Sequence, residues 1–206
     1  MDGPSQSDKS EYPVVPRNRV ITYLVLALSG AAIDLWTKSV IFRWRGLPGQ
    51  RDVWWIVEEH FGIETAVNPG AVFGLGAGMG VVFAMLSIAA GVGIVVWLFW
   101  FRAAESMWLT VALGMISGGI LGNLYDRLGL WWQDGYHPEW KSGVRDWILV
   151  RFEGVPLFDP WPNFNLADSL LVVGAGMLLY QSFIQGDDSP AKKDTQSESD
   201  EQNSDE

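Results

Sequence analysis

The chain has 206 residues, of which 49% are hydrophobic and only 18% charged, with no cysteine and two histidines. Average soluble domains carry about 25% charged residues, so this chain is depleted in charge. The lack of cysteine excludes disulfides, thiolate nucleophiles and iron–sulfur clusters. His60 and His137 fit neither a Ser-His-Asp triad nor a His-rich metal motif. Any chemistry must therefore come mainly from carboxylates, Lys, Arg, Asn and hydroxyl groups.

The net charge of −10 is concentrated at the C-terminal end, where residues 187–206 hold eight acids and two lysines. The remainder is close to neutral and offers no basic face, so a nucleic-acid partner is excluded. Residues 1–16 and 187–206 have too little apolar surface to offset the entropy of ordering. We expect two disordered tails around one domain at 17–186.

Four apolar stretches predict four membrane-spanning helices. The stretch 79–101 runs for 23 residues without a charge, and 107–125 for 19; runs beyond about 18 predict spanning helices. The stretch 20–42 contains Asp34 and Lys38, and 169–184 is long enough only if it begins near Asn165. The short link at 102–106 makes the second and third helices antiparallel neighbours. Four spans place both termini on one side, with two long loops on the other.

Tryptophans flank the predicted spans, as is typical of the membrane–water interface. The basic residues divide almost evenly between the two sides, so the positive-inside rule does not decide the orientation.

Charges that persist in a membrane face the protein interior or a wet cavity. Asp34 and Lys38 are four residues apart, so they share a helix face and can pair; a structural ion pair and a direct substrate role both fit this spacing. Gly114, Gly118 and Gly122 leave one helix face bare for close packing, and Asn123, Asp126 and Arg127 follow at the end of that helix. They fit an interfacial helix end or a functional site equally well.

The remaining candidates lie in the two long loops. Asn68 opens a Gly-rich segment to Gly74, where it can be a turn residue or bind a peptide backbone. Asp146 lies in the second loop, with Val144 and Trp147 nearby, and on spacing alone it is an ordinary loop aspartate. Asn165 stands three residues before Asp168, which is the spacing of a helix N-cap. Two carboxylates buried side by side would titrate separately and could share a proton.

Five motifs in this order resemble the lipoprotein signal peptidase family, signal peptidase II. They are Asp34 with Lys38, the Asn-x-Gly-Ala-x-Phe-Gly segment at 68–74, Gly-Asn-x-x-Asp-Arg at 122–127, Val-x-Asp-aromatic at 144–147, and Phe-Asn-x-Ala-Asp-Ser at 164–169. The resemblance covers about residues 20–185.

The resemblance implies an all-α membrane protein of four transmembrane helices, with a small extracytoplasmic β-cradle carrying Asn68. It implies a bacterial inner-membrane aspartic endopeptidase with cytoplasmic termini and a site near the periplasmic face. Such an enzyme cuts diacylglyceryl-modified prolipoproteins before the lipidated cysteine, uses no metal or other cofactor, and is inhibited by globomycin. We expect a monomer in contact with membrane lipid. The implied catalytic pair is Asp146 and Asp168, supported by Asp34, Lys38, Asn68, Asn123, Asp126, Arg127 and Asn165.

This chain departs from the family pattern near Asp146. An insertion at 128–143 precedes it, Arg145 replaces an apolar neighbour, and Trp147 replaces phenylalanine. Asp126, Asp134 and Asp159 are other carboxylates in this region, but only Asp146 has the Val-x-Asp-aromatic pattern.

Two other classes of function compete with the peptidase. A small proton-coupled transporter would use the same carboxylates as a relay, although carriers place such groups near mid-bilayer. A non-catalytic assembly factor would use the glycine faces and leave the aspartate motifs unexplained.

Overall fold

The structure is a computed structural model, and it describes residues 15–70, 75–152, 154 and 161–186. Four long helices lie in this part of the chain: α1 (Arg17–Arg45), α2 (Gly80–Val95), α3 (Met107–Arg127) and α4 (Leu166–Gly186). A π-helical turn at Val96–Trp100 extends α2, and a short 3₁₀ turn at Ala103–Glu105 leads into α3. All four are long and apolar enough to cross a membrane.

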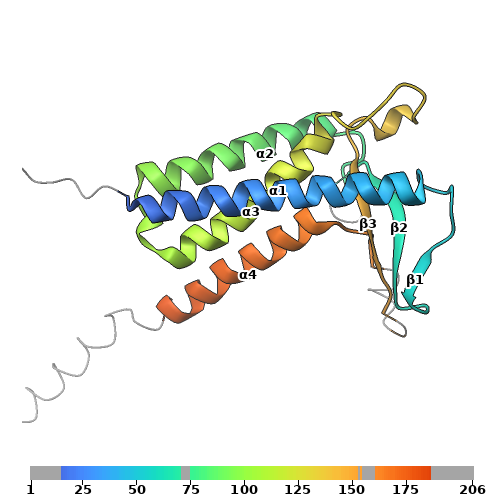
Figure 1. Cartoon of the computed structure of the whole chain (residues 1–206). Helices are drawn as coiled ribbons and strands as arrows, with labels where there is room; N and C mark the ends of the chain where they lie inside the picture. Colours follow the sequence, from blue (N-terminus) through green and yellow to red (C-terminus); the bar gives the residue numbers. More distant parts are fainter. Residues whose placement is uncertain (1–14, 71–74, 153, 155–160, 187–206) are drawn as a thin grey trace, which may run out of the picture.

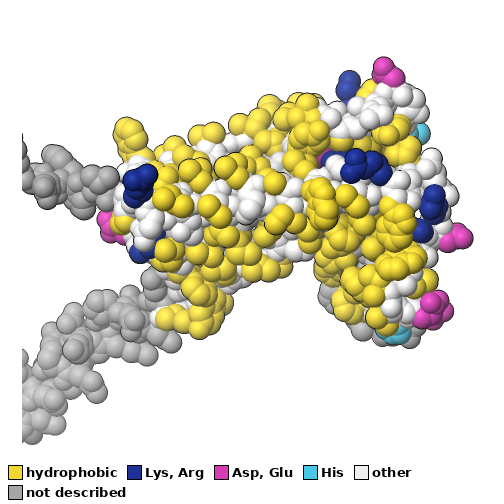
Figure 2. All heavy atoms as spheres, in the orientation of Figure 1, with side chains coloured by type: hydrophobic (Ala, Val, Ile, Leu, Met, Phe, Trp, Pro, Cys, Tyr) yellow, Lys and Arg dark blue, Asp and Glu magenta, His cyan; other side chains and the backbone are white. Residues whose placement is uncertain are grey.

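The four predicted spans are confirmed. α1 extends the stretch 20–42 at both ends, and α3 continues to Arg127. α4 begins at Leu166, next to the Asn165 start that its length required. The apolar side chains of this bundle largely face outward: Leu28, Val81 and Val172 are 61%, 70% and 71% exposed. Figure 2 shows apolar atoms covering the visible face of the helices, with charged groups gathered at the two ends. Apolar side chains on the outside of the bundle and charged groups at its ends are typical of helices surrounded by lipid.

Helix α3 is the centre of the bundle and contacts each of the other three helices. Its glycines allow this approach, as the four-residue spacing predicts. A Cβ at Gly118 would lie 3.2 Å from the carbonyl oxygen of Leu26, and one at Gly122 would lie 2.5 Å from Asp34 Oδ2. Close backbone packing of this kind drives helix association in lipid, so the glycine face holds α1 against α3.

A small antiparallel sheet lies at one end of the bundle, in the order β1–β2–β3 (Figure 1). Its strands are β1 (Trp54–Val57), β2 (Phe61–Asn68) and β3 (Val144–Val150). The expected β-cradle is therefore present. Asp146 lies in β3, so its placement in a loop is corrected: the unbroken apolar run from Trp147 to Val150 that follows it fits a strand covered on both faces.

The first and last described residues lie at the opposite end of the bundle from the sheet (Figure 1). The expected tails at 1–16 and 187–206 fall almost wholly outside the described residues, and so do residues 71–74 of the glycine-rich motif and Asp159.

The glycine packing can be tested at Gly119, on the α4 side of α3. A methyl there would overlap the carbonyl oxygen of Ala167 and lie 2.7 Å from Leu171 Cγ, whereas a methyl at Gly176 meets nothing within 4 Å. We expect Gly119→Ala to lower stability by about 1–3 kcal/mol, measured by thermal unfolding in detergent. Gly176→Ala is the matched control and should not lower it; equal melting temperatures for both variants would contradict the packing.

Candidate active site

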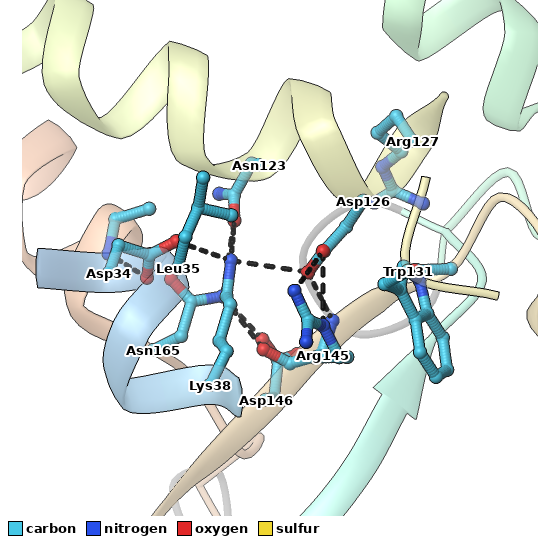
Figure 3. Close-up of polar contacts among 12 residues, drawn as sticks. Asp34, Leu35, Lys38, Asn123, Asp126, Arg127, Trp131, Arg145, Asp146 and Asn165 are labelled. Atoms are coloured by element: carbon cyan, nitrogen blue, oxygen red, sulfur yellow. Dashed lines mark hydrogen bonds and ion pairs between the residues drawn. The ribbon is translucent and has the colours of Figure 1, made fainter. Parts of the chain in front are cut away.

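A buried lysine joins two helices where the bundle meets the sheet. Lys38 Nζ lies 2.7 Å from Asp34 Oδ2 and 3.3 Å from Asp126 Oδ2, and it donates to Asn123 Oδ1 at 3.0 Å (Figure 3). The side chains of Lys38, Asp34 and Asp126 are fully buried. The predicted ion pair within α1 is present, and it extends to α3.

Asp34 also reaches the last helix. Its Oδ1 accepts the backbone N–H of Ala167 at 2.9 Å. The first N–H groups of a helix have no partner within the helix and carry partial positive charge. Asp34 satisfies one of them, so a single carboxylate ties α1 to the start of α4.

The N-terminus of α4 has the predicted capping arrangement. Asp168 N–H donates to Asn165 Oδ1 at 3.0 Å, and Asn165 N–H donates to Asp168 Oδ2 at 3.1 Å. This reciprocal pair is a capping box with an aspartate in the acid position. It holds both side chains in fixed orientations at the helix entrance.

Asn165 joins the two candidate catalytic acids. Its Nδ2 donates to Asp146 Oδ1 at 2.6 Å and to Asn123 Oδ1 at 3.2 Å. Asn123 Nδ2 in turn donates to Asp168 Oδ1 at 2.8 Å. Asp146 and Asp168 are therefore parts of one hydrogen-bonded cluster, each held by an asparagine amide.

The sheet carries Asp146 to this cluster. β2 and β3 pair from Phe61 opposite Val150 to Asn68 opposite Val144, with a register break between Ile63 and Ala66. Two residues of β2 there oppose one residue of β3, which is a β-bulge, and bulges re-aim side chains beside functional sites. Phe164 pairs with Ile148 on the other side of β3, so the segment entering α4 runs alongside Asp146.

The two acids have different surroundings. Asp146 is only 2% exposed, whereas Asp168 is half-buried and lies in the first turn of α4. Burial raises the pKa of Asp146 well above its usual value, and the negative charge of Asp168 raises it further. Asp168 accepts two N–H bonds at a helix N-terminus, where the dipole favours a negative group.

Arg127, the last residue of α3, binds three backbone carbonyl groups. Its guanidinium donates to the carbonyl oxygens of Asn68 and Ser142 at 3.2 and 3.0 Å, and also to that of Gly70. Asn68 Oδ1 accepts the Gly70 N–H at 3.0 Å, which is the turn role proposed for it. Arg127 thereby ties the end of β2 to the insertion.

All nine predicted site residues lie within this region, and the structure adds a residue whose role the sequence did not reveal. Arg145 is buried and pairs with Asp126 Oδ1 at 2.8 Å. A charged residue inside an apolar strand was the available signal, because buried arginine requires an acid partner. Asp134 is exposed. Among the described residues, no group of three or more His, Cys, Asp or Glu is placed to hold a metal ion.

Comparisons with known proteins agree with this architecture. The family model described as Signal peptidase (SPase) II matches residues 26–184. A lipoprotein signal peptidase of Rhodopirellula baltica is 61% identical over 174 residues, covering 84% of this chain and 77% of the relative. A lipoprotein signal peptidase of Pseudomonas fluorescens is 38% identical over 132 residues, covering 62% of this chain and 69% of the relative.

A solved bacterial membrane enzyme has the same fold, with a TM-score of 0.66 and 23% identity, over 85% of this chain and 93% of that one. The four spans and the family match define a multi-pass bacterial membrane peptidase. Within that class, the chain belongs to the signal peptidase II family. The resemblance seen in its motifs is confirmed, and the transporter alternative is not favoured.

The raised pKa of Asp146 predicts a pH-dependent stability. Above the usual aspartate pKa of 3.8 the unfolded chain loses a proton that folded Asp146 retains, so the contribution of Asp146 to stability falls as pH rises. Asp146→Asn removes this effect. We expect the variant to be more thermostable than the wild type near neutral pH, with the gap narrowing toward pH 4.

Thermal unfolding in detergent across that pH range measures the gap. Asp134→Asn is the control, because that carboxylate is exposed. A wild type as stable as Asp146→Asn at every pH would contradict the burial argument.

Proposed function

We propose that this peptidase is an aspartic endopeptidase whose dyad is Asp146 and Asp168. Its substrates are diacylglyceryl-modified prolipoproteins, and it cuts before the lipidated cysteine to remove the signal peptide. The observation that carries the proposal is the Asn165 bridge: its side chain binds Asp146 and its backbone N–H binds Asp168. Two acids held this way, one buried and one partly open, suit a pair that shares one proton.

The different surroundings of the two acids assign their roles. Asp168, partly exposed and held by two N–H donors, is the ionised member and takes a proton from the attacking water. Asp146, whose pKa is raised, is the protonated member and donates to the carbonyl oxygen as negative charge develops there. The water oxygen bonds to the carbonyl carbon. The tetrahedral intermediate then collapses: the carbon–nitrogen bond breaks and the leaving amine takes the proton held by Asp168. Asp146 regains its proton from a hydroxyl group of the intermediate as the product carboxyl group forms, so the pair again holds one proton.

Asn165 supports this assignment through geometry. Its Nδ2–H donates to Asp146 Oδ1 at 2.6 Å. Because Oδ1 already accepts a hydrogen bond, the proton of Asp146 belongs on Oδ2. Asn123 and the backbone of Asn165 each bind one oxygen of Asp168. Both carboxyl groups are thereby oriented before substrate arrives, which is the preorganisation that electrostatic catalysis needs.

The membrane position of the site suits a lipid-anchored substrate. Asp146 lies on the sheet and Asp168 on the first turn of a span, so the pair lies where hydrocarbon gives way to water. We propose that the protein is in the inner membrane with the sheet on the periplasmic side. There a diacylglyceryl anchor stays in the outer leaflet while the peptide bond reaches the dyad. In this arrangement the protein acts as a monomer, and a globomycin-type peptide would compete for the same cleft.

The dyad is tested by Asp146→Asn and Asp168→Asn, each assayed as purified protein on a diacylated prolipoprotein by gel shift. We expect at least a 10³-fold loss of cleavage in each variant, because neither can share a proton with the remaining acid. Asp134→Asn is the matched control and should cleave normally. Normal processing by either dyad variant would reject the assignment, provided that the protein is folded and membrane-inserted.

A further inference from the structure

Arg145 is a buried cation beside the dyad that the proposed mechanism does not use. It is 5% exposed, lies next to Asp146 in β3, and follows the insertion at 128–143. A buried arginine is unfavourable unless it is paired and hydrogen-bonded. The groups that contact Arg145 therefore indicate the role for which it is buried.

Three donors of Arg145 converge on one carboxylate. Its Nε and Nη2 donate to Asp126 Oδ1 at 3.1 and 2.8 Å, and its backbone N–H donates to Asp126 Oδ2 at 3.0 Å. The guanidinium holds one oxygen and the backbone N–H holds the other, and donors on both oxygens fix the orientation of the carboxylate, which a single lysine contact cannot do. Asp126 is thus locked in orientation, and β3 is locked to the end of α3.

The insertion supplies an aromatic wall for the same guanidinium. The Arg145 guanidinium carbon lies 5.3 Å from the Trp131 ring centroid and 5.9 Å from that of Phe42. Trp131 is almost fully buried, packs edge-on against Phe42, and donates its indole N–H to the Gly143 carbonyl at 3.0 Å. The Trp131 ring is therefore fixed by Phe42 on one side and by the Gly143 carbonyl on the other. Together the two rings exclude water from the Arg145–Asp126 pair.

The locked carboxylate is connected to Asp168 by a chain of contacts, of which Figure 3 shows the steps through Lys38 and Asn123. Asp126 Oδ2 lies 3.3 Å from Lys38 Nζ, and Lys38 donates to Asn123 Oδ1. A lysine ammonium only donates, so it requires the oxygen of the Asn123 amide to face it. The amide nitrogen of Asn123 is then directed at Asp168 Oδ1.

We propose that Arg145, seated against Trp131, is a positioning residue for the dyad: it orients Asp126, and through Lys38 and Asn123 it sets the direction of Asp168. Within the insertion, Trp131 then helps to position the dyad, because its ring forms the wall that holds Arg145. This inference rests on the proposed function of Asp146 and Asp168.

The test compares Arg145→Met, Arg145→Lys and Arg151→Met in the full-length protein, assayed on a diacylated prolipoprotein. Arg151 is the matched control: it is exposed, follows the same strand, and stacks on Trp55 at 5.1 Å. We expect Arg145→Met to lower kcat about 10–100-fold with KM changed less than about twofold. Arg145→Lys should recover part of kcat, and Arg151→Met should leave both constants unchanged.

The pH profile provides a readout that loss of folded protein would not move. Asp146 faces charges from every element around it, namely Lys38, Asp126, Arg127 and Asp168. Without Arg145, the negative charge of Asp126 is less neutralised, and that charge raises the pKa of Asp146. We expect the alkaline limb of the kcat profile to move to higher pH in Arg145→Met and to stay in place in Arg151→Met.

Trp131→Leu tests the wall without removing the cation, and it replaces Arg145→Met if that variant does not fold. Trp132→Leu is its control, because Trp132 contacts Lys141 rather than Arg145. Trp131→Leu should lower kcat, and adding it to Arg145→Met should cause little further loss.

The positioning role is overturned if the Arg145 and Trp131 variants keep wild-type kcat while the Asp146 and Asp168 variants are inactive. Activity in those two aspartate variants would instead overturn the proposed function.

Discussion

The need to neutralise charge at the membrane boundary governs this structure. Lys38, fully buried in α1, contacts two acids and one amide that come from α1 and α3. A charge in hydrocarbon costs at least about 2.5–3.5 kcal/mol, so this cation is retained only while its partners surround it. The same ammonium orients Asn123 toward Asp168. The ammonium that neutralises Asp34 and Asp126 therefore also aligns, through Asn123, a third acid, Asp168.

Two further devices bring chain-distant residues to this centre. The glycines of α3 let α1 approach until Asp34 touches both the α3 backbone region and the start of α4. The bulged pairing of β2 and β3, with Phe164 bound along β3, places Asp146 beside Asn165. Helix packing supplies the part of the site that lies on α1, α3 and α4, and the small sheet supplies the part that carries Asp146. Neither part contains both acids.

Sequence reasoning predicts the periodic and local features of this protein well. The spans, the Asp34–Lys38 pair, the glycine face and the capping box all follow from spacings of three to five residues or from runs of apolar residues. Asp146 was assigned only through family resemblance, because its place depends on pairing with β2, about 80 residues earlier in the chain. Arg145 illustrates the limit most clearly. Its partners Asp126, Trp131 and Phe42 lie on α3, in the insertion and on α1, and no local spacing in the sequence predicts that they meet.

The hydrogen bond from Ala167 to Asp34 has a consequence for biosynthesis. The ribosome synthesises α1 first and α4 last. Asp34 therefore has no hydrogen bond from Ala167 until the final helix is inserted. Until then the cluster lacks Asn165 and Asp168, and the nascent chain has no complete acid pair. Under the proposed mechanism, the protein is therefore inactive throughout translation and gains peptidase activity only as its last helix docks.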